Sequence, residues 1–110
     1  DSTVFTRISE VVQYINNNYA GDLSLTSLAK EFHYNPSYLS RKFKESTGFN
    51  TNEYMTHVRL LEAERLLVTS SLRIVKIAEK TGFASQTHFG RQFKNYKGMT
   101  PSAYRKEVRV

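Results

Sequence analysis

The sequence predicts an all-α protein built from two similar halves. Apolar residues recur at intervals of three and four along most of the chain, the spacing that gathers them on one face of a helix. No segment of useful length alternates apolar and polar residues as a half-buried strand does. A group of residues near position 28 also returns about 50 positions later. We therefore expect about seven helices, with one long helix between the two halves.

The first two helices are predicted within residues 1–35. The first begins behind Ser2 or Thr3 and ends at Ala20-Gly21-Asp22, where glycine and aspartate favour a turn. Ser24 is the expected N-cap of a short second helix. The apolar residues expected to face inward are Val4, Ile8, Val11, Val12, Ile15 and Tyr19 in the first helix and Leu25, Leu28, Ala29 and Phe32 in the second.

A third helix and the long helix follow. Asn35-Pro36 predicts the start of the third helix, since asparagine is a good N-cap and proline suits the first helical position. Gly48 is expected to end this helix after it has buried Leu39 and Phe43. Asn50, with Glu53 three residues later, predicts the start of the long helix, which runs to about Val68. The expected apolar residues of the long helix are Tyr54, Val58, Leu61, Leu66 and Leu67.

Three more helices are predicted in residues 70–110, with turns at Gly82 and Gly98 between them. The residues expected to start these helices are Ser70 or Ser71, Ser85 and Thr100-Pro101. The residues expected to face inward are Ile74, Ile77, Ala78, Phe89, Phe93 and Tyr104.

The repeat corresponds to two copies of a helix-turn-helix motif. Arg41-Lys42-Phe43-Lys44 returns as Arg91-Gln92-Phe93-Lys94 after 50 positions, and Leu28-Ala29 returns as Ile77-Ala78 after 49. One extra residue in the second turn accounts for the difference in offset. Each copy consists of a short helix, a tight turn and a second helix. We therefore predict one domain over residues 1–110, with a first subdomain at 1–50, a linker helix at 51–69 and a second subdomain at 70–110.

Basic residues are concentrated toward the C-terminus. The chain has 16 Lys+Arg against 10 Asp+Glu, a formal net charge of +6. Residues 1–35 carry a net charge of −2, residues 36–70 carry +1 and residues 71–110 carry +7. This distribution favours a polyanionic partner, nucleic acid before a membrane surface, with a merely solubilising surface as the alternative.

The composition excludes several classes of function. The absence of cysteine rules out a disulfide scaffold, a thiol nucleophile and a cysteine-ligated zinc site. No apolar run is long enough to span a membrane or to form a signal peptide, so we expect a soluble cytoplasmic protein. His33, His57 and His88 lack the spacing of paired metal ligands, and Glu62 and Glu64 project from different faces of the long helix. We therefore predict no enzyme, no metal and no cofactor.

The second helix of each motif is predicted to expose a polar face opposite its buried pair. A rotation of about 100° per residue separates these faces. The residues placed on the exposed face are Ser37, Tyr38, Arg41 and Lys44 in the first copy and Thr87, His88, Arg91 and Lys94 in the second. Most of the fourteen aromatic residues fall at core positions, which argues against base stacking on single strands, although Tyr38 stays open.

This polar face suits the major groove of DNA, where the start of the second helix of such a motif lies. Arginine can bond both acceptors of guanine, and Gln86 can do the same with adenine. Lys44, Lys94 and Lys97 lie further along, where phosphates are the expected partners. Backbone amides at the capped helix starts, near Asn35 and Ser85, can also hold phosphate oxygens.

An ordered set of residues over nearly the whole chain, from about Ile8 to Val108, resembles the signature of the AraC/XylS family of bacterial transcription regulators. The matching residues of the first copy are Leu28-Ala29, Tyr38-Leu39-Ser40-Arg41, Phe43-Lys44, Thr47-Gly48 and Tyr54. Those of the second copy are Ile77-Ala78, Gly82-Phe83-Ala84-Ser85, Phe89, Arg91, Phe93-Lys94, Gly98, Thr100-Pro101 and Tyr104-Arg105.

The resemblance implies sequence-specific binding of double-stranded DNA by recognition helices at about 36–47 and 86–96, in two successive segments of the major groove. The base contacts it implies are Ser37, Ser40 and Arg41 in the first helix and Gln86, Thr87, His88 and Arg91 in the second. It further implies an output domain that activates transcription, RNA polymerase as a second partner, and a sensor or receiver domain outside these residues. We expect the chain, which begins Asp1-Ser2-Thr3, to be a monomeric piece of a longer protein.

Four positions depart from the repeat or suggest that the two recognition helices read bases unequally. His33 stands where the second copy has Gly82, and a left-handed histidine costs about 1 kcal/mol. The small Ser37 and Ser40 suggest weaker base reading by the first recognition helix. Gly90 lies inside the second recognition helix, where it would let the helix approach the groove closely.

The remaining alternatives are a basic face for an acidic protein partner and a general nucleic-acid binder without sequence preference.

Overall fold

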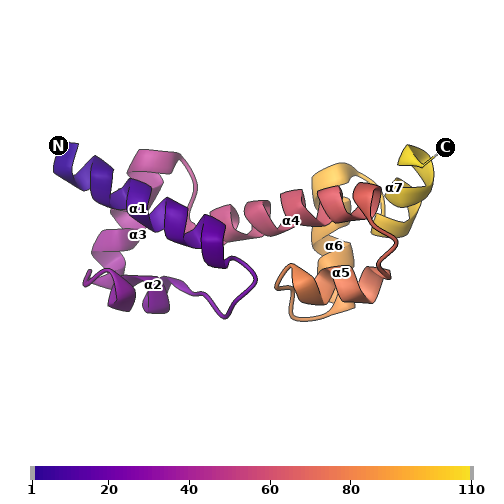
Figure 1. Ribbon diagram of the computed structural model, residues 1–110. Coiled ribbons are helices and arrows are strands. Elements are labelled where there is room, and N and C mark those ends of the chain that lie inside the picture. The colour runs from indigo at the N-terminus through magenta and orange to yellow at the C-terminus, as the bar shows by residue number, and fades with distance from the viewer. Residues whose placement is uncertain (1, 110) are drawn as a thin grey trace. The chain divides into compact units, whose positions relative to one another are not determined.

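The computed structural model describes residues 2–109, and over that range it contains seven α-helices and no strand (Figure 1). The helices are α1 (Ser2–Asn18), α2 (Leu25–Glu31), α3 (Pro36–Thr47), α4 (Thr51–Thr69), α5 (Ile74–Lys80), α6 (Gln86–Lys97) and α7 (Pro101–Val108). The prediction of an all-α fold with seven helices is confirmed. Within the described residues, no helix combines the length and the apolar character that crossing a bilayer requires.

The chain divides into two units, Asp1–His57 and Val58–Val110, and the division falls inside α4. Each unit has its own hydrophobic core. The buried residues of the first core are Ile8, Val11, Ile15, Leu28, Ala29, Leu39, Phe43 and Met55. Those of the second core are Leu60, Ala63, Leu67, Ile77, Ala78, Phe83, Phe89 and Phe93. The long helix therefore belongs to both units, with its first half in one core and its second half in the other.

The second half of α4 plays the part in the second unit that α1 plays in the first. Ile8, Val11 and Ile15 of α1 are buried in the first core, and Leu60, Ala63 and Leu67 of α4 are buried in the second with the same spacing. The structural repeat thus starts one helix earlier than the motif seen in the sequence. A recurrence of this apolar spacing after 52 positions is its only sequence signal.

Most predicted helix starts are confirmed by hydrogen bonds that the cap side chains accept from backbone amides of the first turn. Asn35 Oδ1 accepts from the amides of Ser37 at 2.9 Å and Tyr38 at 3.3 Å. Ser85 Oγ accepts from the amide of His88 at 3.0 Å, and Ser24 forms a capping box with the residue three positions on. These bonds satisfy amides that the first turn of a helix leaves without partners.

Several predicted details of the helices are wrong. α5 begins at Ile74 behind Arg73, so neither Ser70 nor Ser71 starts it. The hydroxyl of Ser70 instead donates to the carbonyl of Leu66 at 2.7 Å, at the end of α4. Ser2 and Thr3 lie within α1. Leu61 is 47% exposed, whereas four α4 residues that were not predicted to face inward are buried: Thr51, Met55, Leu60 and Ala63.

The turn between the two helices of each motif takes the left-handed conformation. φ is 60° at His33 and 92° at Gly82. Glycine adopts this conformation without strain, whereas a residue with a Cβ atom pays about 1 kcal/mol. The expectation that His33 replaces a turn glycine in the first copy is confirmed.

Arg105 of α7 holds the end of α4 within the second unit. Its guanidinium donates to three backbone carbonyls, of Leu67 at 3.1 Å, Ser70 at 3.2 Å and Leu72 at 2.6 Å. Burial and the nearby Arg109 lower the pKa of Arg105. The last carbonyls of a helix have no partner inside it, so this side chain supplies donors where α4 ends.

Candidate nucleic-acid interface

α3 exposes the predicted polar residues and buries the predicted apolar pair. Leu39 and Phe43 are fully buried in the first core. The predicted contact residues that are exposed are Asn35, Ser37, Arg41 and Lys44, and those that are half-buried are Tyr38 and Ser40. The phase deduced from the buried pair therefore holds for Ser37, Arg41 and Lys44, whereas Tyr38, which was predicted on the exposed face, is half-buried.

α6 repeats this arrangement in the second unit. Phe89 and Phe93 are fully buried. The predicted contact residues, all of them exposed, are Ser85, Gln86, Thr87, His88, Arg91, Lys94 and Lys97. Within the second unit, α6 thus places the predicted side chains at the surface, where a partner can reach them.

A ring contact supports the first turn of each recognition helix. The rings of Tyr34 and Tyr38 lie 5.5 Å apart, and those of Phe83 and His88 lie 5.8 Å apart. The turn residue of each pair packs on the third residue of the recognition helix. Tyr38 and His88 are therefore held in place before any partner arrives.

Tyr38 also orients the arginine on its own helix. Arg41 Cζ lies 5.5 Å from the centroid of the Tyr38 ring, and Lys42 Nζ lies 5.7 Å from it. A cation over an aromatic face gains about 0.5–1 kcal/mol at an exposed site. The half-buried Tyr38 thus packs against the turn and fixes a neighbouring arginine, a role that sequence spacing alone does not indicate.

Lys97 differs from the other lysines predicted to bind phosphate. Its Nζ lies 2.9 Å from Glu64 Oε2 in α4. The same carboxylate accepts hydrogen bonds from the hydroxyls of Tyr96 at 2.7 Å and Tyr104 at 3.0 Å. Lys97 can therefore reach a phosphate only by leaving or sharing Glu64.

The groups around Glu64 shift one another's pKa values. Burial raises the pKa of Glu64, but the hydrogen bonds from Lys97, Tyr96 and Tyr104 outweigh this, so the pKa lies below its ordinary value. The bond to Glu64 raises the pKa of Lys97. These partners are 32 to 40 residues from Glu64, so helical periodicity does not reveal the cluster.

We predict that Glu64 makes the stability of the second unit depend on acid pH. Because the folded-state pKa lies below the unfolded value, the stabilisation is present above about pH 4.3 and is lost as the pH falls through the folded pKa. Urea denaturation of the wild type across this range should show a fall that Glu64→Gln lacks. Equal pH profiles for the two proteins would contradict the assignment.

The described residues bring together no group of three His, Cys, Asp or Glu side chains that could hold a metal ion. The exposed cations and hydrogen-bonding side chains of α3 and α6 instead suit an anionic partner with polar edges. Duplex DNA presents both in one groove, with phosphates at its rim and base edges at its floor.

Comparisons with known proteins agree with this geometry. A family model described as a helix-turn-helix domain matches residues 28–107. The HTH-type transcriptional activator AarP of Providencia stuartii is 38% identical over 98 residues, which cover 89% of this chain and 73% of AarP. The chain spans much less of other curated relatives, 39% of one and 13% of another.

Two solved structures share the fold closely. The C-terminal domain of AraT, a response regulator from Geobacillus stearothermophilus, is similar with a TM-score of 0.91 and 32% identity, covering 94% of this chain and 87% of that one. The DNA-binding domain of AdpA, a global transcriptional factor solved in complex with a target DNA, is similar with a TM-score of 0.89 and 27% identity. That likeness covers 93% of this chain and 92% of the AdpA chain.

Proposed function

The chain belongs to the AraC/XylS type of helix-turn-helix domain, the DNA-binding part of transcription regulators rather than of enzymes, and we propose that α3 and α6 read two successive segments of the major groove. One observation carries the proposal: both helices expose the same kinds of side chain at equivalent positions. The equivalent pairs are Ser37 and Thr87, Tyr38 and His88, Arg41 and Arg91, and Lys44 and Lys94. Two similar helices with matched polar faces suit two successive segments of the same major groove.

The side chains divide into base-reading and phosphate-binding groups. Arg41 and Arg91 carry the planar donor pairs that match guanine, and Gln86 matches adenine. The other base-reading residues that we propose are Ser37, Tyr38, Ser40, Thr87 and His88. The phosphate-binding residues that we propose are Lys44, Lys94 and Lys97, together with the backbone amides near Asn35 and Ser85.

The two units contribute unequally to DNA affinity in this proposal. Residues 1–57 have five Lys/Arg and six Asp/Glu, whereas residues 58–110 have eleven and four. Attraction to phosphate dominates the salt-dependent part of DNA binding. The second unit therefore supplies most of this attraction, and α6 supplies the stronger base contacts because its exposed side chains are larger.

Methylation of guanine N7, an acceptor in the major groove, tests the assignment of the groove. On a duplex that the protein binds, methylation interference should appear at two groups of bases about one helical turn apart. Interference confined to one group would remove one helix from the proposal. Interference by minor-groove modification alone would contradict it.

We further propose that the whole protein acts in the bacterial cytoplasm and activates transcription; the name of the relative AarP describes that protein as a transcriptional activator. A sensor or receiver domain would then lie outside these residues, RNA polymerase would be a second partner, and the present chain would act as a monomer. A promoter fusion with the selected DNA site upstream should rise in expression when the full-length protein is present. A fall in expression would indicate a repressor.

We predict opposite effects of Gly90 substitutions on stability and on DNA binding. A Cβ atom at Gly90 would meet nothing within 4 Å, so the fold does not require glycine in α6. Gly90→Ala should raise the free energy of unfolding by about 1 kcal/mol. Gly90→Leu should fold but bind duplex DNA more weakly, since the proposal places Gly90 where the groove comes close. Unchanged affinity of the leucine variant in a fluorescence titration would contradict this close approach.

A further inference from the structure

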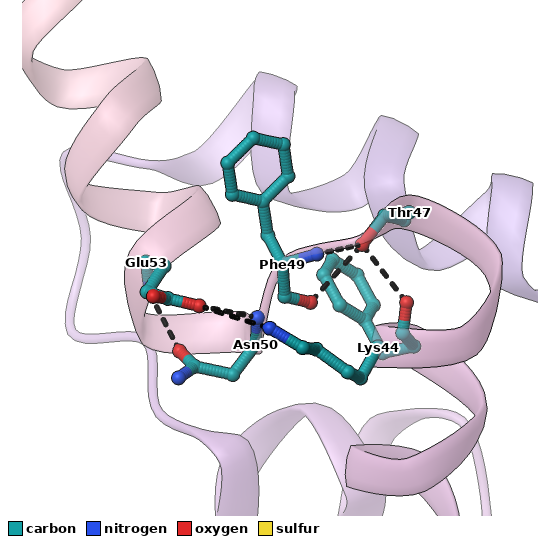
Figure 2. Close-up of polar contacts among 6 residues, drawn as sticks. Lys44, Thr47, Phe49, Asn50 and Glu53 are labelled. Atoms are coloured by element: carbon teal, nitrogen blue, oxygen red, sulfur yellow. Dashed lines mark hydrogen bonds and ion pairs between the residues drawn. The ribbon is translucent and has the colours of Figure 1, made fainter.

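Lys44 in α3 has an acidic neighbour that its counterpart in α6 lacks. Lys44 Nζ lies 3.8 Å from Glu53 Oε1, the carboxylate oxygen of a residue in the first turn of α4 (Figure 2). The two side chains are 58% and 54% exposed, so the ion pair lies on the surface of the first unit. Such a pair contributes at most about 1 kcal/mol to folding, and its lysine can exchange partners.

The turn between α3 and α4 holds the carboxylate beside the lysine. The amide of Asn50 donates to Glu53 Oε1 at 2.9 Å, and the amide of Glu53 donates to Asn50 Oδ1 at 2.8 Å, which makes a reciprocal cap (Figure 2). Thr47 Oγ1 bonds the carbonyl of Phe43 at 2.8 Å and accepts from the amide of Phe49 at 3.1 Å. The bond from the amide of Asn50 therefore keeps the carboxylate of Glu53 close to the turn and beside Lys44.

The equivalent turn of the second unit has the same backbone cap without the acid. Thr100 Oγ1 accepts from the amide of Ala103 at 3.2 Å, as Asn50 accepts from Glu53. Ala103 thus occupies the position of Glu53, 50 residues later. Among the described residues, Lys94 has no carboxylate within ion-pair distance.

We propose that Glu53 competes with DNA phosphate for Lys44 and so sets the affinity of the first recognition helix below that of the second. This inference rests on the proposed function, in which Lys44 and Lys94 take equivalent phosphates. A phosphate that approaches Lys44 meets the negative charge of Glu53, whereas Lys94 has no carboxylate within ion-pair distance among the described residues. Glu53 thereby makes the protein depend more on its second unit for affinity.

Glu53→Gln is the variant that tests the charge alone. A glutamine oxygen can accept the same bond from the amide of Asn50, so the cap persists while the charge is lost. On a labelled duplex of mixed sequence at low salt, the variant should bind about threefold more tightly. This is the effect of removing one carboxylate charge that lies about 7 Å from a DNA phosphate in water. The slope of log affinity against log salt should steepen by at most about 0.9, the change expected if Lys44 contacts a phosphate only after Glu53 loses its charge.

Two further variants separate this effect from net charge and from stability. Glu10→Gln changes the net charge equally at an exposed position of α1 and measures the general effect. Ala103→Glu places the acid beside Lys94 and should weaken binding about threefold. Glutamate at this position of a capped helix also favours folding, so weaker binding together with undiminished stability could not come from a folding defect.

The outcomes distinguish this inference from the proposed function. Tighter binding by Glu53→Gln than by Glu10→Gln supports competition at Lys44. Equal binding by the two variants overturns the inference alone if the wild type still binds DNA in an Arg91-dependent manner. Weaker binding by Glu53→Gln also overturns it, since Glu53 would then position Lys44 for DNA. A wild type that binds no duplex overturns both the inference and the proposed function.

Discussion

Replacement of Arg91 by alanine is expected to weaken binding to the preferred duplex by about 1–3 kcal/mol and to relax the preference at one base pair. Arg91 is exposed on α6, where the buried Phe89 and Phe93 direct the opposite face toward a partner. The loss should be largest for the duplex that carries guanine at the contacted position. Titrations with the four possible base pairs at each position would locate this contact.

Lys94→Ala is the matched control on the same helix. Removal of a phosphate contact should weaken binding to all sequences similarly and should flatten the salt dependence by about one unit of slope. If both variants lose affinity equally for specific and for random DNA, the division into base-reading and phosphate-binding residues is wrong.

The same pair of variants discriminates between the remaining alternatives. An acidic protein partner would depend on the basic side chains without any dependence on DNA sequence. A general nucleic-acid binder would keep the salt slope and would show no preferred duplex for Arg91→Ala to disturb. Sequence-dependent loss in Arg91→Ala alone is the result that favours the proposed function.

Replacement of Arg105 by alanine is expected to lower the stability of the second unit by about 2–3 kcal/mol. The side chain donates to three carbonyls that lie where α4 ends, namely those of Leu67, Ser70 and Leu72. Its loss would leave the carbonyls of Leu67 and Leu72 without this donor, whereas the carbonyl of Ser70 would keep its bond from Arg109. Urea denaturation would measure the change, and hydrogen exchange should show the loss of protection in residues 58–110.

Two comparison variants define what Arg105 contributes. Arg105→Lys keeps the charge but lacks the forked guanidinium, so it should recover only a small part of the loss. Lys106→Ala removes a neighbouring exposed cation and should change stability by less than about 0.5 kcal/mol. An Arg105→Ala variant as stable as Lys106→Ala would contradict the role assigned to the guanidinium.

The parts of the fold that depend on local chemistry could be predicted from the sequence. Asn35 and Ser85 cap their helices, and Gly48 ends α3 with a φ of 83°, because each preference acts within a few residues. The buried pairs of α3 and α6 set the phase of the exposed face. The positions of the candidate contact residues therefore followed from the sequence once the pairs were recognised.

The wrong predictions concern segments that belong to two parts of the fold at once. α4 contributes Met55 to the first core and Leu60 to the second, so its apolar residues do not form a single stripe. Leu61 continues the helical spacing of Tyr54 and Val58, yet it is exposed. Ser70 could cap α5 or close α4, and local preference does not choose between them.

Contacts between residues far apart in the chain could not be predicted from the sequence either. The Glu64 cluster joins α4 to Tyr96, Lys97 and Tyr104, and only the folded second unit brings them together. The pairing of Lys44 with Glu53 requires the geometry of the intervening turn, although the cap at Asn50 was itself visible in the sequence. Periodicity and capping preferences therefore do not predict side-chain networks that bridge helices.

Selection of bound duplexes from a random double-stranded library, at about physiological salt, tests the central claim most directly. Two recognition helices in successive major-groove segments predict a bipartite motif whose halves lie about one helical turn apart. Guanine in the half read by α6 should lose its enrichment when Arg91→Ala replaces the wild type. A single short motif, or no enrichment at all, would contradict reading by both helices.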